Sequence, residues 1–247
     1  MAEFKDHFSS GSEGYRTFRP RYPESLYKWL YTKIPHPAVV WECGAGSGQA
    51  TEQLANHFDK VIATEPSAAQ INQAPELDNV EYQVCTAESF KSQPESIDAV
   101  IVAQAIHWFD HDKFFANVNE LLKPGGLVAV FGYQLMYVND ALDPLLKEFH
   151  DEFVGPYWPE ERKLLNEGYK DIQFPFKELE TPEFTMSDEW DLDHLLGYLN
   201  TWSATKAFEK DKGENPVELW RDKLTAAWGD VDKQKVSWPL VLYVGRV

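Results

Sequence analysis

The sequence predicts an α/β protein in which a doubly wound, mostly parallel sheet is covered by helices on both faces. Short apolar segments alternate with segments of helical spacing up to residue 133, and this alternation is typical of βαβ units. A glycine-rich turn follows the first apolar segment, at the point where such sheets place a nucleotide. With 247 residues, the chain is long enough for one full core with elaborations.

The expected elements follow one another in a regular order. A helix is expected at 23–34, because Pro23 can occupy a first turn and Glu24 favours the positive end of the helix dipole. The expected strands are 38–43, 60–65, 80–85, 96–105 and 127–133. The expected helices between them are 48–58, 67–74 and 111–122, the last one ended by the sequence KPGG.

The alternation ends after Tyr133. Residues 140–170 are expected to be mostly helical, with interruptions at Pro156 and Pro159. The remaining segments are expected as strand-like pieces at 174–186, one long aromatic-rich helix at 188–208, a helix at 216–228, and a strand at 238–247. We therefore expect a helical cap inserted into the core, followed by a last strand that returns to the edge of the sheet.

The charge of the chain limits its partners. Acidic residues outnumber basic ones 40 to 23, which gives a net charge of −17. Such a field repels phosphate backbones and anionic membrane surfaces, so neither nucleic acid nor a membrane is expected as a partner. The only candidate basic patch is formed by Arg16, Arg19 and Arg21.

Cysteine usage and the first residues favour a cytoplasmic protein. Cys43 and Cys85 each lie in an apolar segment, which favours reduced, buried thiols over a disulfide framework or a metal site. No apolar run resembles a signal peptide or approaches the length of a membrane span. The oligomeric state stays open.

The glycine-rich turn distinguishes between nucleotide cofactors. A dinucleotide-binding turn requires a third small residue, and Gln49 stands at that position. The chain instead has an acidic residue, Glu42, followed by Gly44, Gly46 and Gly48. This arrangement resembles the first motif of class I methyltransferases that use S-adenosylmethionine. The resemblance implies that the glycine backbone lies against the sugar and methionine portions of that cofactor, with the acidic residue near its positive end.

Three further marks follow in order along the chain. Glu65 ends the second expected strand, 17 residues beyond Gly48, where it can accept hydrogen bonds from both ribose hydroxyls. Ala87 and Glu88 follow the third strand and resemble the segment that borders the adenine in this family. The fourth strand ends at Ala103 and Gln104, at the edge of the sheet where ligands bind.

The resemblance covers most of the chain. Residues 15–133 resemble the type 11 methyltransferase domain, and the segments YRTFRPRYP, AQAIHWFD and YLNTWSA resemble trans-aconitate methyltransferase-like proteins. Those proteins methylate small molecules, in some cases at a carboxylate. The resemblance implies a seven-stranded, Rossmann-like methyltransferase fold. It divides the chain into an N-terminal lid and helix (1–35), a cofactor-binding core (36–135), a helical cap with a strand of the sheet (136–235), and a final edge strand (236–247).

The resemblance also implies which residues bind S-adenosylmethionine. They are Tyr15, Arg19, Glu42, Gly44, Ala45, Gly46, Gly48, Glu65, Pro66, Ala87, Glu88, Ala103 and Gln104. Arg19 can pair with the carboxylate of the cofactor or with an acidic substrate. The structural alternative for Arg19 is a surface position stacked on neighbouring aromatic rings.

The acceptor site is expected beside the end of the fourth strand. His107 is a candidate catalytic residue, either as a donor that positions the acceptor or as a base, and Trp108 is expected as a wall of the site. The structural alternative places both residues in a strand-to-helix turn. Further residues expected to line the acceptor site are Tyr22, Tyr133, Tyr198 and Trp202, although the last two also fit the spacing of a helix core. Arg162 and Lys163 resemble a solvated face and are not assigned to the site.

The expected function is therefore methyl transfer from S-adenosylmethionine to a small organic molecule, with a carboxylate as the candidate target. The alternative from another class is a non-catalytic protein that binds the cofactor for regulation or assembly. A dehydrogenase is disfavoured by Gln49. Nucleic-acid methylation is disfavoured by the net charge and by the sequence AQAI at the end of the fourth strand.

Overall fold

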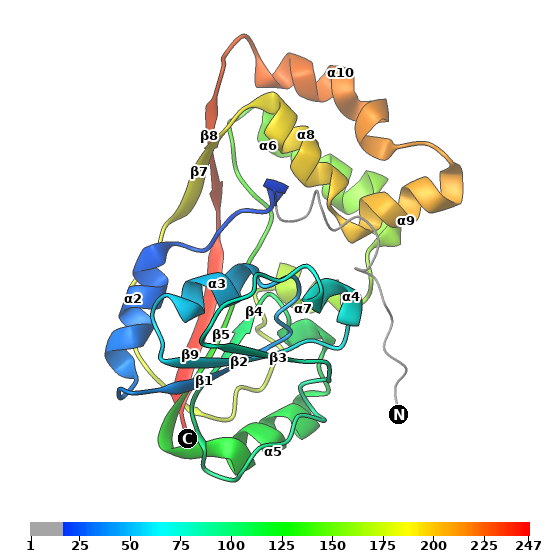
Figure 1. Cartoon of the computed structure of the whole chain (residues 1–247). Helices are drawn as coiled ribbons and strands as arrows, with labels where there is room; N and C mark the ends of the chain where they lie inside the picture. Colours follow the sequence, from blue (N-terminus) through cyan, green and yellow to red (C-terminus); the bar gives the residue numbers. More distant parts are fainter. Residues whose placement is uncertain (1–16) are drawn as a thin grey trace.

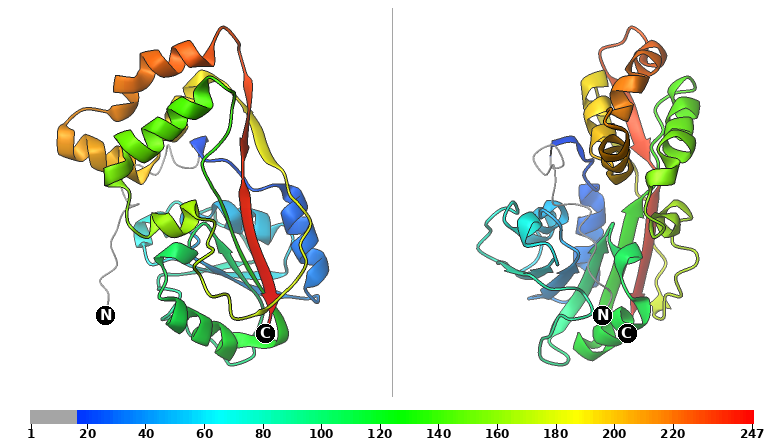
Figure 2. Two further views of the ribbon diagram at one scale, coloured as in Figure 1. Left: turned by 180° about the vertical axis from the view of Figure 1, so that it is seen from behind. Right: turned by 90° about the vertical axis from the view of Figure 1, so that its right-hand side faces the viewer.

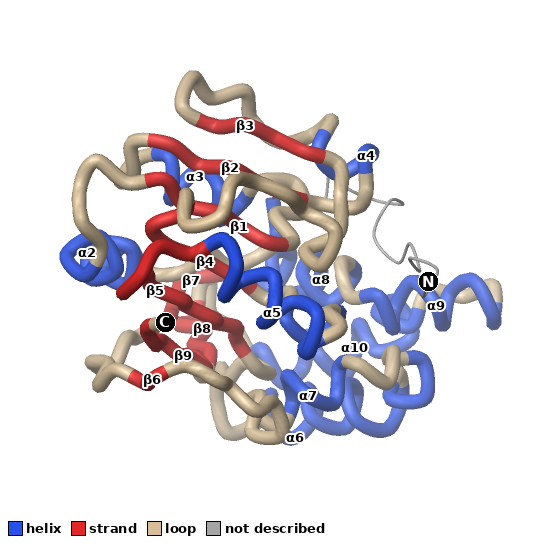
Figure 3. Tube along the Cα trace, turned by 90° about the horizontal axis from the view of Figure 1, so that it is seen from below, coloured by secondary structure: helices blue, strands red, loops and turns tan. Residues whose placement is uncertain are grey.

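The core of the protein is a seven-stranded sheet in the computed structural model, which describes residues 17–247 (Figure 1). The strand order is β3-β2-β1-β4-β5-β9-β6 (Figure 3). The strands are β1 (Val39–Cys43), β2 (Lys60–Thr64), β3 (Val80–Gln83), β4 (Ile97–Ala103), β5 (Leu122–Tyr133), β6 (Lys177–Glu178) and β9 (Leu240–Arg246). Neighbours among β1–β5 pair in parallel, whereas β9 is antiparallel to β5 and β6. The predicted mostly parallel, doubly wound sheet is confirmed.

Both faces of the sheet are covered by helices. On one face, α2 (Glu24–Lys33) and α3 (Gln49–Ala55) bury Leu26 and Leu54 against strand residues such as Val40. On the other face, α5 (His111–Leu121) places Phe114 against Trp41. Successive side chains of a strand point to opposite faces of the sheet. The run VVW therefore contributes side chains to the cores on both faces, which explains why it is apolar at every position.

The prediction of β9 as the edge strand is wrong. The short strand β6 lies outside β9, so β9 is hydrogen-bonded on both sides. Strand β5 also starts at Leu122, earlier than predicted, because Leu122 pairs with Ile97 of β4 on the near side of an irregularity in the ladder. The helix before it still ends at Leu121, as the KPGG sequence indicates.

The cap is a second aromatic-rich core beyond the end of the sheet (Figures 1 and 2). It contains α6 (Leu142–Glu148), the short helices 149–153 and 155–157, α8 (Leu192–Asn200), α9 (Ser203–Lys212) and α10 (Pro216–Trp228), with the strands β7 (Met186–Trp190) and β8 (Gln234–Trp238). The remaining short helices are α4 (Ala68–Ile71), at the sheet, the 3-10 helix Ile106–Trp108, which follows β4, and α7 (Arg162–Asn166), between sheet and cap. None of the helices within residues 17–247 combines the length and apolar character needed to cross a membrane.

The single long helix predicted at 188–208 is wrong. The segment starts as strand β7, and Asp191 then caps α8 by accepting a hydrogen bond from the backbone N–H of His194. A second break follows α8, where Trp202 is extended and precedes α9. The predicted strand at 238–247 is likewise two strands, because the chain passes at Pro239 from the β7–β8 pair to the main sheet.

The segment before α2 connects the cap to the sheet. Phe18 packs against Gly197 of α8, where any Cβ atom would collide with its ring. The Phe18 carbonyl also accepts a hydrogen bond from His194 Nε2, at 3.3 Å. At the sheet, Tyr22 packs edge-on against Phe131 of β5, with ring centroids 4.7 Å apart. The predicted site residue Tyr15 lies outside the described residues.

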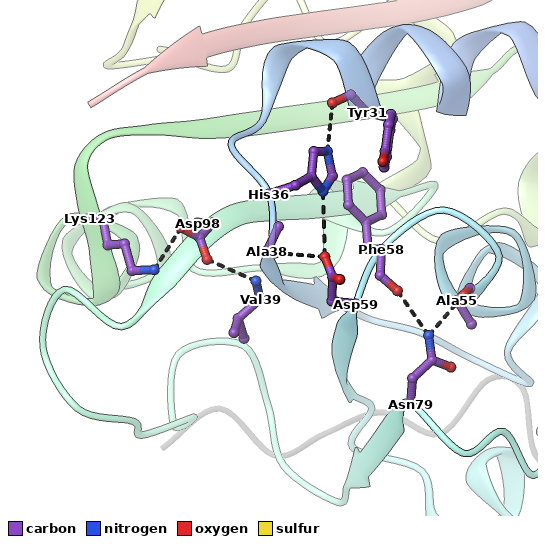
Figure 4. A network of polar contacts seen from close by, with 10 residues as sticks. All are labelled: Tyr31, His36, Ala38, Val39, Ala55, Phe58, Asp59, Asn79, Asp98 and Lys123. Atoms are coloured by element: carbon purple, nitrogen blue, oxygen red, sulfur yellow. Dashed lines mark hydrogen bonds and ion pairs between the residues drawn. The ribbon is translucent and has the colours of Figure 1, made fainter.

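A polar network fixes the opposite end of the sheet (Figure 4). Asp98 accepts a hydrogen bond from the backbone N–H of Val39 (2.8 Å) and forms an ion pair with Lys123 (2.7 Å). Asp59 accepts from the N–H of Ala38 at 2.9 Å. These bonds anchor the amino ends of the strands, so the carboxyl ends are the side at which loops form a binding site.

Candidate active site

The glycine loop follows β1 directly, and its first glycine, Gly44, has no room for a side chain. Gly44 and Gly46 have φ angles of 71° and 58°, in the left-handed region that favours glycine. A Cβ atom on Gly44 would lie 2.6 Å from the Cβ of Ala105. The N–H groups of Gly44 and Ala45 both donate to the carbonyl of Thr64, which ties the loop to the end of β2. The backbone of the loop is therefore exposed to a ligand without side chains in between.

Glu65 stands beside this loop at the end of β2. Its Oε2 accepts a hydrogen bond from the N–H of Gly46, and its Oε1 accepts one from the N–H of Ser67, both at 3.0 Å. The side chain is 6% exposed, so these two bonds hold a largely buried carboxylate at a fixed place. The position matches the one predicted for a ribose contact.

Glu42 lies beneath the loop and is fully enclosed. Burial raises the pKa of Glu42 to about 8, a hydrogen bond from Thr51 opposes the rise, and the charge of Glu65 adds to it. The Thr51 hydroxyl donates to Oε2 at 2.5 Å. Burial therefore favours the protonated carboxyl of Glu42 unless a positive charge lies nearby.

A cleft brings most of the predicted cofactor residues together. Among the predicted residues, its lining includes Tyr22, Glu42, Gly44, Ala45, Gly46, Glu65, Pro66, Ala103, Gln104, Trp108 and Tyr133. Residues that the sequence did not indicate also line it, namely Ser47, Gln49, Ala50, Gln70, Ala105 and Phe109. A bare backbone, a fixed carboxylate and apolar walls suit the sugar, amino acid and adenine parts of S-adenosylmethionine.

Some predicted cofactor residues lie elsewhere. Gly48 caps α3 behind the loop, where a Cβ atom would lie 2.8 Å from Pro75 Cδ. Glu88 Oε1 accepts a hydrogen bond from the N–H of Asp110 at 2.8 Å. Ala87 is buried below it, and Asn117 donates to its carbonyl. None of these three is among the described residues that line the cleft.

Gln104 connects the cleft to a second cavity. Its φ is 56°, and its side chain clamps β5, because Oε1 accepts from the N–H of Tyr133 (2.8 Å) and Nε2 donates to the Tyr133 carbonyl (3.1 Å). The Tyr22 hydroxyl also donates to Oε1. Gln104 and Trp108 line both spaces, which places the second cavity next to the cofactor cleft.

The second cavity is aromatic and cationic. Its described lining residues are Arg19, Gln104, His107, Trp108, Trp158, Pro159, Arg162 and Ser203. Arg19 donates to the Tyr133 hydroxyl at 3.3 Å and to the Thr201 carbonyl at 3.1 Å. Arg162 lies over the Trp158 ring, 4.8 Å from its centroid. No carboxylate is among these lining residues, although the whole chain has a net charge of −17.

His107 lies in the wall of this cavity. Burial, with the charges of Arg162 and His111, lowers the pKa of His107 to about 3, so its ring is neutral near pH 7. Its Nδ1 lies 3.1 Å from the hydroxyl of Tyr169, a buried residue that follows α7. No local sequence pattern indicates this contact, which joins residues 62 positions apart.

The structure does not bring Tyr198 and Trp202 into either cavity. Trp202 is 2% exposed and packs among Phe149, His150 and Trp158 in the cap. Tyr198 is buried beneath the Arg19 guanidinium, which lies 5.4 Å from its ring centroid. Both residues therefore pack in the core of the cap, as the alternative interpretation of their spacing predicted.

Four residues that line the second cavity were not predicted as site residues: Trp158, Pro159, Arg162 and Ser203. Arg162 belongs to the charged run EERK at 160–163, which on sequence has the pattern of a solvated helix face. No local pattern distinguishes it from Lys163, which is exposed in the structure.

The strand order, the left-handed glycine loop after β1 and the carboxylate at the end of β2 together define a class I S-adenosylmethionine-dependent methyltransferase. A family model described as a methyltransferase domain matches residues 41–130. The chain is 32% identical to a Dictyostelium discoideum protein described as a methyltransferase, over 99% of this chain and 96% of that protein. It is 26% identical to a Saccharomyces cerevisiae protein described as an S-adenosylmethionine-dependent methyltransferase, over 95% of each.

A solved structure agrees with these relatives. The structure of a protein from Anaeromyxobacter dehalogenans, described as a type II methyltransferase, matches with a TM-score of 0.85 and 39% sequence identity. The match covers 93% of this chain and 98% of that one. The chain belongs to the S-adenosylmethionine-dependent methyltransferases, and its cofactor is S-adenosylmethionine.

Proposed function

We propose that this methyltransferase acts on a carboxylate of a small organic acid. The proposal is supported by the cavity beside the cofactor cleft, which is lined by Arg19 and Arg162 together with the rings of tryptophan residues. No acidic side chain is among its described lining residues. Guanidinium groups bind carboxylates through paired, charge-assisted hydrogen bonds. A net charge of −17 repels a long polyanion such as a nucleic acid over its whole length. A small acid can instead fit inside the cavity, where the arginines offset the negative field locally.

The cofactor is assigned to the cleft between the glycine loop and Glu65. S-adenosylmethionine supplies a methyl group activated by a sulfonium charge. We assign Glu65 to the ribose hydroxyls, the backbone of Gly44 and Gly46 to the amino acid and sugar portions, and Glu42 to the positively charged side. A positive charge there would favour the ionised form of Glu42.

We assign further residues around the cleft to the cofactor. Ala87 and Glu88 are assigned to the border of the adenine, and Tyr15 and Arg19 to the lid over the cofactor. The division of the chain into lid (1–35), cofactor core (36–135) and cap (136–235) is likewise proposed, and it is supported by the separate aromatic core of the cap.

A carboxylate acceptor suits the chemistry of the cavity. It is ionised near neutral pH, so no proton has to be removed before it accepts a methyl group. The task of the protein is then to orient the acceptor, to exclude water and to hold the acid beside the cofactor. The aromatic rings of Trp108 and Trp158 form walls that can exclude water.

The proposal is tested with acceptors that differ only in the reacting group. Purified protein is incubated with S-adenosylmethionine and benzoate, benzyl alcohol or benzylamine, and succinate and trans-aconitate extend the acid series. Mass spectrometry is expected to detect methyl esters of acids and no methylated alcohol or amine. Turnover of the alcohol or the amine without any ester would contradict the proposal.

A further inference from the structure

Tyr169 holds the ring of His107 in a fixed environment. The residue is 1% exposed and its backbone is left-handed, with φ of 59°. Its N–H donates to the Leu164 carbonyl at 2.7 Å, which fixes the turn after α7. Its hydroxyl faces β5, where a Cβ atom on Gly132 would lie 3.1 Å away. The hydroxyl is therefore enclosed where it approaches β5.

The hydrogen-bonding needs of Tyr169 determine where the proton of His107 lies. Within the described residues, the only hydrogen-bond partner of its hydroxyl is Nδ1 of His107, at 3.1 Å. If Nδ1 were protonated, it would donate to the hydroxyl oxygen, and the buried hydroxyl hydrogen would be left without an acceptor, which is unfavourable. The alternative satisfies both groups, because the hydroxyl donates to an unprotonated Nδ1. The proton of the neutral ring then lies on Nε2.

Nε2, the other nitrogen of the ring, is not engaged by Tyr169. His107 lines that cavity together with Arg19 and Arg162, and its Nε2 has no hydrogen bond within residues 17–247. The charged or titratable groups that act on the ring are Arg162 from α7, His111 from α5 and the Tyr169 hydroxyl. His111 is itself engaged, because its Nε2 donates to the Ile106 carbonyl at 3.0 Å.

We propose that Tyr169 is a positioning residue that fixes the tautomer of His107, so that His107 presents an Nε2–H donor to the acceptor and does not act as a base. The identity of the acceptor rests on the proposed function, whereas the tautomer does not. The cavity then offers donors from Arg19, Arg162 and His107 and no side-chain base among its described residues. Such a site selects acceptors whose nucleophilic atom is already ionised in solution, such as carboxylates, and disfavours alcohols and ammonium groups.

The first test measures the tautomer directly in the full wild-type chain. The protein is labelled with ¹⁵N-histidine, and long-range proton–nitrogen correlation spectra are recorded near pH 7, with His107→Gln used to assign the ring. The expected result is an Nδ1 signal in the range of an unprotonated nitrogen and an Nε2 signal in the range of an N–H. The reverse pattern, or a doubly protonated ring, would overturn the inference.

The second test separates a donor from a base. In His107→Gln, the side-chain amide can still donate a hydrogen bond but cannot take up a proton. We expect kcat with benzoate to fall by less than about tenfold and its pH profile to keep the wild-type shape, whereas loss of a general base costs about 10²–10⁴-fold. A loss of kcat in that range, with a new dependence on pH, would contradict a donor role.

The third test addresses Tyr169 and has a matched control. Tyr169→Phe removes the hydroxyl and frees Nδ1, and we expect KM for benzoate to rise about tenfold with an unchanged Kd for S-adenosylmethionine. Tyr243→Phe removes a nearby hydroxyl that donates to the Gly168 carbonyl and does not contact His107, so KM should stay the same. An equal effect of both variants would show a merely structural role for Tyr169.

The tautomer measurement needs no acceptor, so the two proposals can fail separately. The expected tautomer together with methylation of benzylamine alone would refute the carboxylate acceptor and leave the proton of His107 on Nε2. Ester formation together with an unprotonated Nε2 would refute the role of Tyr169 and leave the proposed function in place.

Discussion

The cleft proposed for the cofactor and the cavity proposed for the acceptor are neighbours, but they are built in different ways. The cleft is lined mainly by the segments that directly follow β1, β2 and β4, including the backbone of Gly44 and Gly46. The cavity combines side chains from the segment before α2, the turn after β4, the cap and the start of α9. Its two arginines, Arg19 and Arg162, are separated by most of the core in the sequence.

The difference shows which part of the enzyme is general and which part is specific. Backbone contacts suit a ligand that every member of the family binds, because they depend on φ angles and strand ends and hardly on side chains. The acceptor meets side chains instead, and these can change without disturbing the sheet. We therefore expect substitutions in the cleft to affect cofactor binding, and substitutions of cavity residues that do not line the cleft, such as Arg162, to affect the acceptor.

The largest effect is expected for Gly44→Ala, which tests the backbone side of the comparison. The left-handed backbone and the contact with Ala105 should together destabilise the fold by about 3 kcal/mol, as measured by urea unfolding. Gly125→Ala is the matched control, because Gly125 has a φ of 78° but open space around it. It should cost only about 1 kcal/mol. Equal losses in the two variants would contradict the importance of the close approach at Gly44.

Glu65→Ala should weaken cofactor binding by about 50–100-fold, corresponding to about 2–3 kcal/mol. The variant loses the proposed ribose acceptor and frees the N–H groups of Gly46 and Ser67. Calorimetric titration with S-adenosylmethionine measures the change, and Glu81→Ala, at an exposed position on β3, is the control. Unchanged affinity in Glu65→Ala would remove Glu65 from the cofactor site.

Arg162→Leu tests whether the cavity binds the acceptor independently of the cofactor cleft. Loss of the guanidinium should raise KM for benzoate by about tenfold, while Kd for S-adenosylmethionine stays within about twofold, because Arg162 does not line the cleft. Lys163→Ala changes an exposed neighbour and should leave both constants unchanged. A weaker affinity for the cofactor in Arg162→Leu would mean that the two sites are not separable.

The smallest effect is expected at the opposite end of the sheet. A hydrogen bond from the backbone N–H of Ala38 lowers the pKa of Asp59, burial opposes this effect, and His36 assists it. A lowered pKa in the folded state stabilises the protein at neutral pH, and this contribution is lost as the pH falls below about 4. Asp59→Asn should therefore reduce the dependence of the unfolding free energy on pH in acid, and leave Kd and KM unchanged. The exposed Asp78→Asn is the control, and an equal change there would refute a specific role of Asp59.

The sequence predicted the elements whose signals are local. The helix expected at 216–228 matches α10, because Asn215 caps it and Pro216 fits its first position. Such signals were weaker in the cap. The segment 188–190 forms a strand only because it pairs with β8, more than forty residues away in the chain, and its composition alone favoured a helix.

The sequence by itself determined the cofactor half of the protein, whereas the tertiary structure decided the acceptor half. Glycines with positive φ and an acid at a strand end are constraints on a short stretch of chain, so Gly44, Gly46 and Glu65 are visible as spacing. The approach of Arg162 and Tyr169 to His107 depends on how α7 packs beside the end of β4. A side-chain contact between residues so far apart in the sequence leaves no local pattern, because many different turns can place the same side chain at that contact.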